Sequence, residues 1–476
     1  MNQRGAFVNA SLAQVTLGKY AKLTGVLGHG FTAGTMVDQF ELLEGAEITI
    51  AEHSTSAAAN AFSVQRRFFL GEKATINYSR TSSAANPFIA LGSTSAASQF
   101  LSEANATISL NQVGPLVTGR STTDIYIGEE NTISLQTAQG FTGGTSSASS
   151  STIRRLHVGD HSEITVSGRS NANVDFFRFR EEIKLGREAK VTVNHTTRQA
   201  ARAVFRLTLA NSKFTMEEAS KVEVDTGGRF LQGVGTTDLL FGENSYTRIN
   251  AARGMTGNTT VRSVTLGQHA EVHLTEPTTT AIQNSATSQN YSRIQVSQRV
   301  ELQDNATMTS RRDRTTSDSR FIWLTASNSF VRIGKGATLD VDQSGGIFRV
   351  TTSSNFILND DATFKGVARG LNTQGGGNWS SSHSNSFANI TVGKRAEFSL
   401  TDNRTGMGTS AEFINRPLVN VRNSFSAEED ATVVLETIRN KSEVLYFRLA
   451  NARLNINNVN SVSYTHLRAH ETLANL

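Results

Sequence analysis

Two stretches of the chain, Val331-Arg-Ile-Gly-Lys-Gly-Ala-Thr-Leu-Asp-Val341 and Ile390-Thr-Val-Gly-Lys-Arg-Ala-Glu-Phe-Ser-Leu400, follow one pattern. An apolar-x-apolar pair is followed by Gly, two solvated residues and then Ala-x-apolar-x-apolar. The pattern returns roughly every 25 to 35 residues between Val15 and Ile456, a spacing typical of repeat folds. We count about sixteen copies, including weaker ones without the Gly.

Each copy has the period of a β-strand. Ala189, Val191 and Val193 lie on one face, with Lys190 and Thr192 on the other. We expect the Gly or Asn before the solvated pair to adopt a positive φ and so to form a sharp corner. Each copy therefore predicts two short strands joined by a corner.

A second strand signal recurs between the copies, as in Val204-Phe-Arg-Leu-Thr-Leu209. Asn follows or accompanies this signal at Asn211, Asn328 and Asn423. We expect left-handed turns there, with side chains that hydrogen-bond from one repeat to the next. Each repeat then holds two or three strands.

A unit this small cannot bury its apolar face alone, so equivalent strands must stack from repeat to repeat. The predicted fold is all-β: a parallel β-helix (β-solenoid) of about sixteen coils, right-handed as is the default for parallel crossovers. A β-sandwich or a β-propeller is the rival, and propeller blades need about four strands in roughly 40 to 45 residues. The irregular spacing favours coils with loops of different length.

The domain prediction is a single parallel β-helix over residues 1–461. The repeat has begun by Val15 without a polar cap, so we expect a fragment of a longer chain. Residues 462–476 break the pattern and are interpreted as a non-native tail, similar to translated adapter sequence. The alternative is a short capping helix. His466 and His470 therefore carry no functional prediction.

Composition excludes several classes of function. The chain has no Cys, which excludes disulfides, thiolate metal sites and a cysteine nucleophile. A net charge of +5 from 46 Lys+Arg and 41 Asp+Glu is too small to predict nucleic-acid binding. No apolar run approaches the roughly 18 residues that cross a bilayer, so we expect no membrane insertion.

No cofactor or metal is expected. Gly28-His-Gly30 lacks the context of a nucleotide site. His269 and His273 lie four residues apart on a predicted strand, about 13 Å along the chain, too far to share zinc. Asp340-Val-Asp342 begins like a calcium loop, but Thr351 stands where the bidentate Glu belongs.

The strongest candidate for catalysis is a pair of carboxylates. Glu271 and Glu301 are assigned the same outward position in consecutive copies, which would place them about 5 Å apart. That separation suits a retaining glycosidase. The alternative is a charged, solvated face, since mixed charges fill this column elsewhere.

Phe-Arg pairs on the second strand suggest a binding surface. The arginines of this set are Arg178, Arg206, Arg229 and Arg349. Alternation along the strand directs Phe inward and Arg outward. In stacked coils we therefore expect a row of outward arginines, an arginine ladder, which is densest across Arg178, Arg206 and Arg229. Guanidinium groups suit carboxylate, sulfate or phosphate, so the expected ligand is an anionic glycan or wall polymer. The alternative is that nearby acids pair with these arginines.

The two tryptophans have different surroundings in the sequence. Trp323 lies in a strand signal and is expected to pack in the core or on a face. Trp379 lies in a Gly/Ser-rich loop, where an exposed indole can stack on a sugar.

The repeated phrase in Val331–Val341 and Ile390–Leu400 resembles the pectate-lyase-like adhesive domains of Gram-positive cell-surface proteins. The resemblance covers most of Val15 to Ile456. It implies a right-handed β-helix on an exported protein at the cell surface or wall, which attaches to host or neighbouring cells without lyase activity. The chain departs from this pattern because it shows neither a signal peptide nor a Leu-Pro-x-Thr-Gly anchor. It also lacks the clustered calcium-binding Asp residues of true pectate lyases.

The leading hypothesis is a non-catalytic adhesive and structural module that binds host, matrix or wall glycans. The first alternative is a β-helix polysaccharide lyase or glycoside hydrolase that uses Glu271 and Glu301. The second alternative is a phage tailspike, for which a trimer is expected.

Overall fold

A computed structural model of the chain describes residues 2–3, 13–27, 31–32, 36–52, 60–81, 83, 85–92, 97–142, 153–168, 174–195, 202–257, 259–276, 292–312, 320–350, 353–369, 386–403, 419–437, 445–447, 451–457 and 461–465. The chain divides into two compact units, each described by itself. Unit 1 comprises Met1–Val261 and Glu276–Thr287, and unit 2 comprises Arg262–Thr275 and Ser288–Leu476.

Unit 1 contains strands of two parallel sheets. The first sheet holds β1 (Asn2–Gln3), β3 (Lys22–Leu27), β5 (Glu47–Glu52), β7 (Thr75–Arg80), β10 (Thr107–Asn111), β13 (Thr132–Thr137), β15 (Glu163–Gly168), β17 (Lys190–His195), β20 (Lys221–Thr226) and β23 (Tyr246–Ala251). The second holds β2 (Gln14–Leu17), β4 (Val37–Leu42), β6 (Phe62–Leu70), β8 (Ile89–Leu91), β9 (Gln99–Ser102), β11 (Val117–Thr118), β12 (Asp124–Ile127), β14 (Ile153–Val158), β16 (Phe177–Leu185), β18 (Ala203–Leu207), β19 (Lys213–Met216), β21 (Arg229–Gln232) and β22 (Asp238–Phe241).

Unit 2 repeats this arrangement. Its first sheet holds β25 (Glu271–Thr275), β27 (Thr307–Arg312), β30 (Thr338–Ser344), β33 (Thr363–Arg369), β35 (Glu397–Asp402), β37 (Thr432–Thr437) and β40 (Ser461–Thr465). Its second holds β24 (Val261–Leu266, from Arg262 onward), β26 (Ile294–Leu302), β28 (Arg320–Leu324), β29 (Phe330–Ile333), β31 (Gly346–Arg349), β32 (Asn355–Leu358), β34 (Ser386–Val392), β36 (Val419–Ala427), β38 (Leu445–Phe447) and β39 (Arg453–Ile456). No helix occurs among the residues described.

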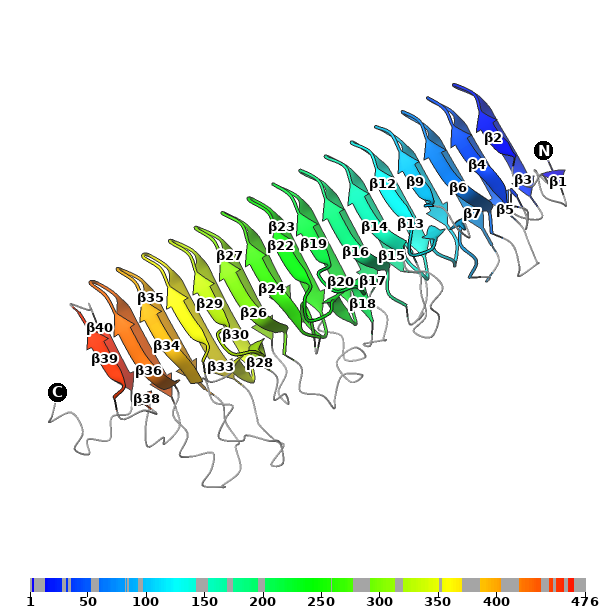
Figure 1. The fold of residues 1–476 in the computed structure, drawn as a ribbon. Helices are drawn as coiled ribbons and strands as arrows, with labels where there is room; N and C mark the ends of the chain where they lie inside the picture. Colours follow the sequence, from blue (N-terminus) through cyan, green and yellow to red (C-terminus); the bar gives the residue numbers. More distant parts are fainter. Residues whose placement is uncertain are drawn as a thin grey trace. The chain divides into compact units, whose positions relative to one another are not determined.

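Equivalent strands of successive repeats pair in parallel and in register. On the first sheet of unit 1, Ile133 of β13 lies beside Ile164 of β15, which in turn lies beside Val191 of β17. Figure 1 shows the strands of each unit side by side in chain order. Parallel in-register stacking confirms the predicted all-β solenoid and is incompatible with a propeller. The right-handed winding and the number of coils stay predictions, as does a single helix across residues 1–461.

The core consists of columns of like side chains, because register places equivalent inward residues on top of one another. In unit 1 the rings of Phe141, Phe177 and Phe205 stack at centroid separations of 5.3 and 5.0 Å, and all three are fully buried. Such pairs stabilise a core beyond the area they bury. Polar side chains also join coils: Asn131 Oδ1 accepts a hydrogen bond from the Ala106 amide at 2.6 Å, and its Nδ2 donates to Ser102 Oγ at 2.6 Å.

The corners differ from the prediction in one respect. The positive φ falls on the second solvated residue, such as Lys73 (59°) or Glu130 (56°), and not on the glycine before the pair. Gly128 and Gly159 are needed for another reason: a Cβ on Gly159 would lie 2.5 Å from the carbonyl carbon of Gly128 in the preceding coil. Close backbone approach between coils, rather than left-handed geometry, therefore requires glycine here.

The second predicted turn is confirmed at two of its three positions. Asn211 (φ 59°) and Asn328 (φ 60°) are left-handed. Asn423 is not, because it lies within the continuous nine-residue strand β36. Near the C-terminus, Val462 of β40 lies beside Val433 of β37, and regular pairing continues to Thr465. The remainder of the predicted tail, residues 466–476, falls outside the described residues.

Candidate functional site

Arg178 on β16 and Arg206 on β18 are direct neighbours in unit 1. The two strands pair Phe177 with Phe205 and Arg178 with Arg206, so the two arginines occupy the same strand position in neighbouring coils. Both phenylalanines are fully buried, so the inward direction of Phe is confirmed. Arg178 alternates with the buried Phe177 and Phe179, so it lies on the opposite face of the strand, yet it is only 8% exposed. We call Arg178 and Arg206 the arginine pair.

Arg229 does not extend the arginine pair. Strand β21 places Gln232, not Arg229, beside Arg206, while Arg229 lies beside Ala203. The predicted ladder through Arg229 is therefore wrong. The reason is local order: Arg precedes Phe in Arg229-Phe230 but follows it in Phe205-Arg206, which shifts the arginine along the strand. Arg229 is buried, with 8% exposure.

The two members of the arginine pair have different polar environments. Arg206 Nη1 donates to Asp175 Oδ2 at 2.9 Å, and Asp175 Oδ1 accepts from the Ala203 amide at 3.1 Å. The Nε and Nη1 of Arg178 are buried and have no hydrogen-bond partner among the described residues. Burial and then the charge of Arg206 lower the pKa of Arg178; Arg202 also lowers it, and Asp175 acts in the opposite direction. Positive charge therefore exceeds negative charge around Arg178.

Trp323 and Arg349 form a second cluster, in unit 2. Strand β31 places Arg349 beside Trp323 of β28, and the guanidinium carbon lies 4.0 Å from the ring centroid. Gln295 of β26 flanks Trp323 on its other side. Ile322 and Leu324 are buried, so the half-buried Trp323 faces outward between them. Face packing of Trp323 is confirmed, but its arginine partner one coil away was not predicted. Burial lowers the pKa of Arg349.

Trp379, the other tryptophan assigned to ligand binding, lies outside the described residues.

The carboxylates assigned to catalysis do not meet. Glu271 on β25 pairs with Thr307 in the first sheet, whereas Glu301 on β26 pairs with Arg332 in the second. The predicted adjacency is wrong because Glu271 follows a corner and Glu301 precedes one. Glu301 instead forms an ion pair with Arg332 at 3.3 Å, and Glu271 Oε2 lies 3.1 Å from His273 Nε2. Within the described ranges, no group of three His, Cys, Asp or Glu residues could hold a metal ion.

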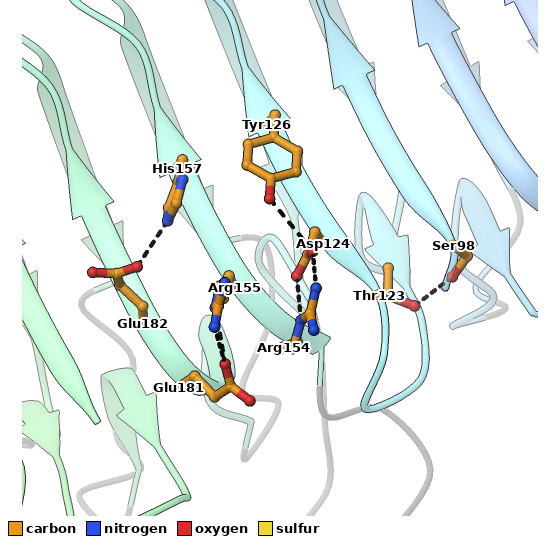
Figure 2. Close-up of polar contacts among 9 residues, drawn as sticks. All are labelled: Ser98, Thr123, Asp124, Tyr126, Arg154, Arg155, His157, Glu181 and Glu182. Atoms are coloured by element: carbon orange, nitrogen blue, oxygen red, sulfur yellow. Dashed lines mark hydrogen bonds and ion pairs between the residues drawn. The ribbon is translucent and has the colours of Figure 1, made fainter. Parts of the chain in front are cut away.

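A polar ladder that the sequence patterns did not predict crosses β12, β14 and β16 of unit 1 (Figure 2). Asp124 accepts hydrogen bonds from both Nε and Nη2 of Arg154, the former at 2.8 Å. The hydrogen bond to Asp124 is the main reason that the pKa of Arg154 is raised.

The next coil adds two glutamates of β16, Glu181 and Glu182, which contact further residues of β14. His157 Nε2 lies 2.8 Å from Glu182 Oε2, and Arg155 Nε donates to Glu181 at 2.8 Å (Figure 2). A His–Glu pair is a component of general-base sites. The acids of this ladder are nevertheless held by basic residues of a neighbouring coil, so the ladder joins coils. The contacting residues are offset in register, since Asp124 lies beside Arg155 and His157 beside Lys184, so comparing single strand positions between repeats does not reveal this ladder.

The chain matches no protein-family model, and no curated protein or solved structure is significantly similar to it. Of the resemblance noted in the sequence, the parallel β-helix is confirmed. In the described part of the chain, no helix has the length and apolar character to cross a membrane.

Proposed function

We propose that the chain is a non-catalytic adhesive and structural module that binds a carbohydrate or matrix polymer at the cell surface or wall. Solenoids present extended, regular surfaces, which suit repetitive polymers. The observation that carries the proposal is the outward Trp323–Arg349 column, because an indole beside a guanidinium offers both a stacking face and hydrogen-bond donors.

Catalysis is not part of this proposal. The retaining pair was inferred from cross-strand adjacency of Glu271 and Glu301, and their strands lie in different sheets, beside Thr307 and Arg332 respectively. Product release from a panel of pectins and glycosaminoglycans would contradict a non-catalytic role. A trimeric mass in solution would instead favour the tailspike alternative.

The direct test is binding of the purified chain to insoluble wall, plant and matrix polysaccharides. We expect Trp323→Ala to weaken binding roughly tenfold, because one aromatic platform is lost. Tyr20→Ala is the matched control, since Tyr20 is an exposed aromatic residue that hydrogen-bonds Glu44 and lies in unit 1. Equal loss in both variants, or no binding to any polymer by the wild-type chain, would contradict the proposal.

A further inference from the structure

The arginine pair of unit 1 presents two guanidinium groups on one face of the solenoid. Strands β16 and β18 are paired with Arg178 beside Arg206, so their backbones lie about 4.8 Å apart. Like charges at this spacing repel one another unless a negative group lies between them. The nearby Asp175 supplies one negative charge, and Arg206 already uses one of its oxygens.

Arg178 differs from a buried arginine that serves only the fold. In unit 2, Arg293 is 3% exposed, and its guanidinium donates to Ser310 Oγ, the Arg311 carbonyl and the Thr275 carbonyl at 3.0, 3.0 and 2.6 Å. Arg178 is more than nine-tenths buried, yet its Nε and Nη1 find no acceptor among the described residues. An unpaired buried charge destabilises a fold, so a missing acceptor marks this position as unusual.

We propose that the arginine pair binds an oxyanion, the sulfate or carboxylate group of an acidic polysaccharide. Such a group accepts charge-assisted hydrogen bonds from guanidinium N–H groups, and both Nε and Nη1 of Arg178 lack an acceptor. Arg206, whose side chain is 22% exposed and anchored by Asp175, supplies the second positive charge and the approach from solvent. The assignment of the oxyanion to a polysaccharide rests on the proposed function, but binding of the oxyanion does not.

The test compares the wild-type chain, Arg178→Gln and the matched control Arg187→Gln. Arg187 is an exposed arginine of the same unit whose guanidinium pairs with Asp160, so its removal changes the net charge equally. The probes are inorganic sulfate against chloride at equal ionic strength, dextran sulfate, polygalacturonate and neutral dextran, each followed by calorimetry. Comparison of dextran sulfate with polygalacturonate then shows whether the arginine pair binds a sulfate or a carboxylate group.

We expect sulfate and at least one anionic polymer to bind the wild-type chain and Arg187→Gln with equal affinity. Their affinity for Arg178→Gln should be about tenfold lower or more. Arg178→Lys keeps the charge but loses the planar fork, so its affinity should fall between these. Arg178→Gln should also melt at a higher temperature than the wild-type chain, because it removes an unpaired buried charge.

Two results would overturn the proposal: equal affinity of the three proteins for sulfate, or a lower melting temperature of Arg178→Gln with unchanged anion binding. Polymer binding that persists equally in all three proteins would overturn the oxyanion site and leave the proposed function standing. Sulfate binding that depends on Arg178, without binding to any polymer, would support the site and contradict the proposed function.

Discussion

The guanidinium carbon of Arg349 lies 4.0 Å from the ring centroid of Trp323, although 26 residues separate them in the sequence. The contact follows from the register of β28 and β31, which places the two side chains next to each other on the outer face. Contacts of this kind depend on coil-to-coil alignment, which makes them sensitive tests of the fold.

Arg349→Ala should shift the fluorescence of Trp323 to longer wavelength, because water replaces the guanidinium over the indole. The measurement needs a Trp379→Phe background, since the chain has only 2 Trp. We expect a loss of stability of about 0.5–1 kcal/mol from the cation–π contact. Arg332→Ala, which removes an arginine 5.2 Å from the Phe330 ring, is the control and should leave the emission unchanged. An unshifted spectrum of Arg349→Ala would mean that the stack does not form.

Gly159→Ala should destabilise unit 1 by about 1–3 kcal/mol, because its Cβ would overlap the backbone of the preceding coil. Gly18 occupies the same corner position, but a Cβ added there would have no neighbouring atom within 4 Å. Gly18→Ala should therefore change the free energy of unfolding by less than about 0.5 kcal/mol. Urea unfolding midpoints measure both effects, and equal shifts would refute the close-approach explanation.

Asn131→Ala should cost about 1–3 kcal/mol, because the buried amide of Ala106 loses its acceptor. The exposed neighbour Thr132→Ala is the control and should be nearly neutral. Chemical denaturation compares the two variants. A neutral Asn131→Ala would show that coils do not depend on this bridge.

Protonation of Asp225 should lower the stability of the folded chain in acid. Burial alone raises the pKa of Asp225, but hydrogen bonds from Arg248 and Asn250 outweigh it and hold the pKa below its ordinary value of 3.8. The native state therefore favours the charged form, so this stabilisation is complete above pH 3.8 and disappears as pH falls through the native pKa.

Asp225→Asn should be less stable than the wild-type chain at pH 7 and should lose less stability below pH 3.8, as followed by thermal melts across pH. Asn250→Ala removes one hydrogen bond at 2.8 Å and should move the acid transition to higher pH. Identical pH profiles for all three proteins would exclude Asp225 as a contributor.

Local sequence patterns were sufficient to predict the strands, their parallel stacking and the inward direction of Phe177 and Phe205. These features depend on alternation within a few residues and on the need of each small repeat to bury its apolar face. The left-handed turn at Asn211 was predictable for the same local reason.

The tertiary structure decided which residues of different coils meet. The lengths of the loops and the position of each residue relative to the nearest corner fix that register. Neither can be read from a single repeat. Glu271 follows a corner and Glu301 precedes one, so the two residues lie in different sheets. The register of β21 against β18 places Gln232 rather than Arg229 beside Arg206. The buried Nε and Nη1 of Arg178, which lack an acceptor, likewise emerged only in three dimensions, because burial and hydrogen bonding belong to the assembled coils and not to the Phe-Arg motif itself.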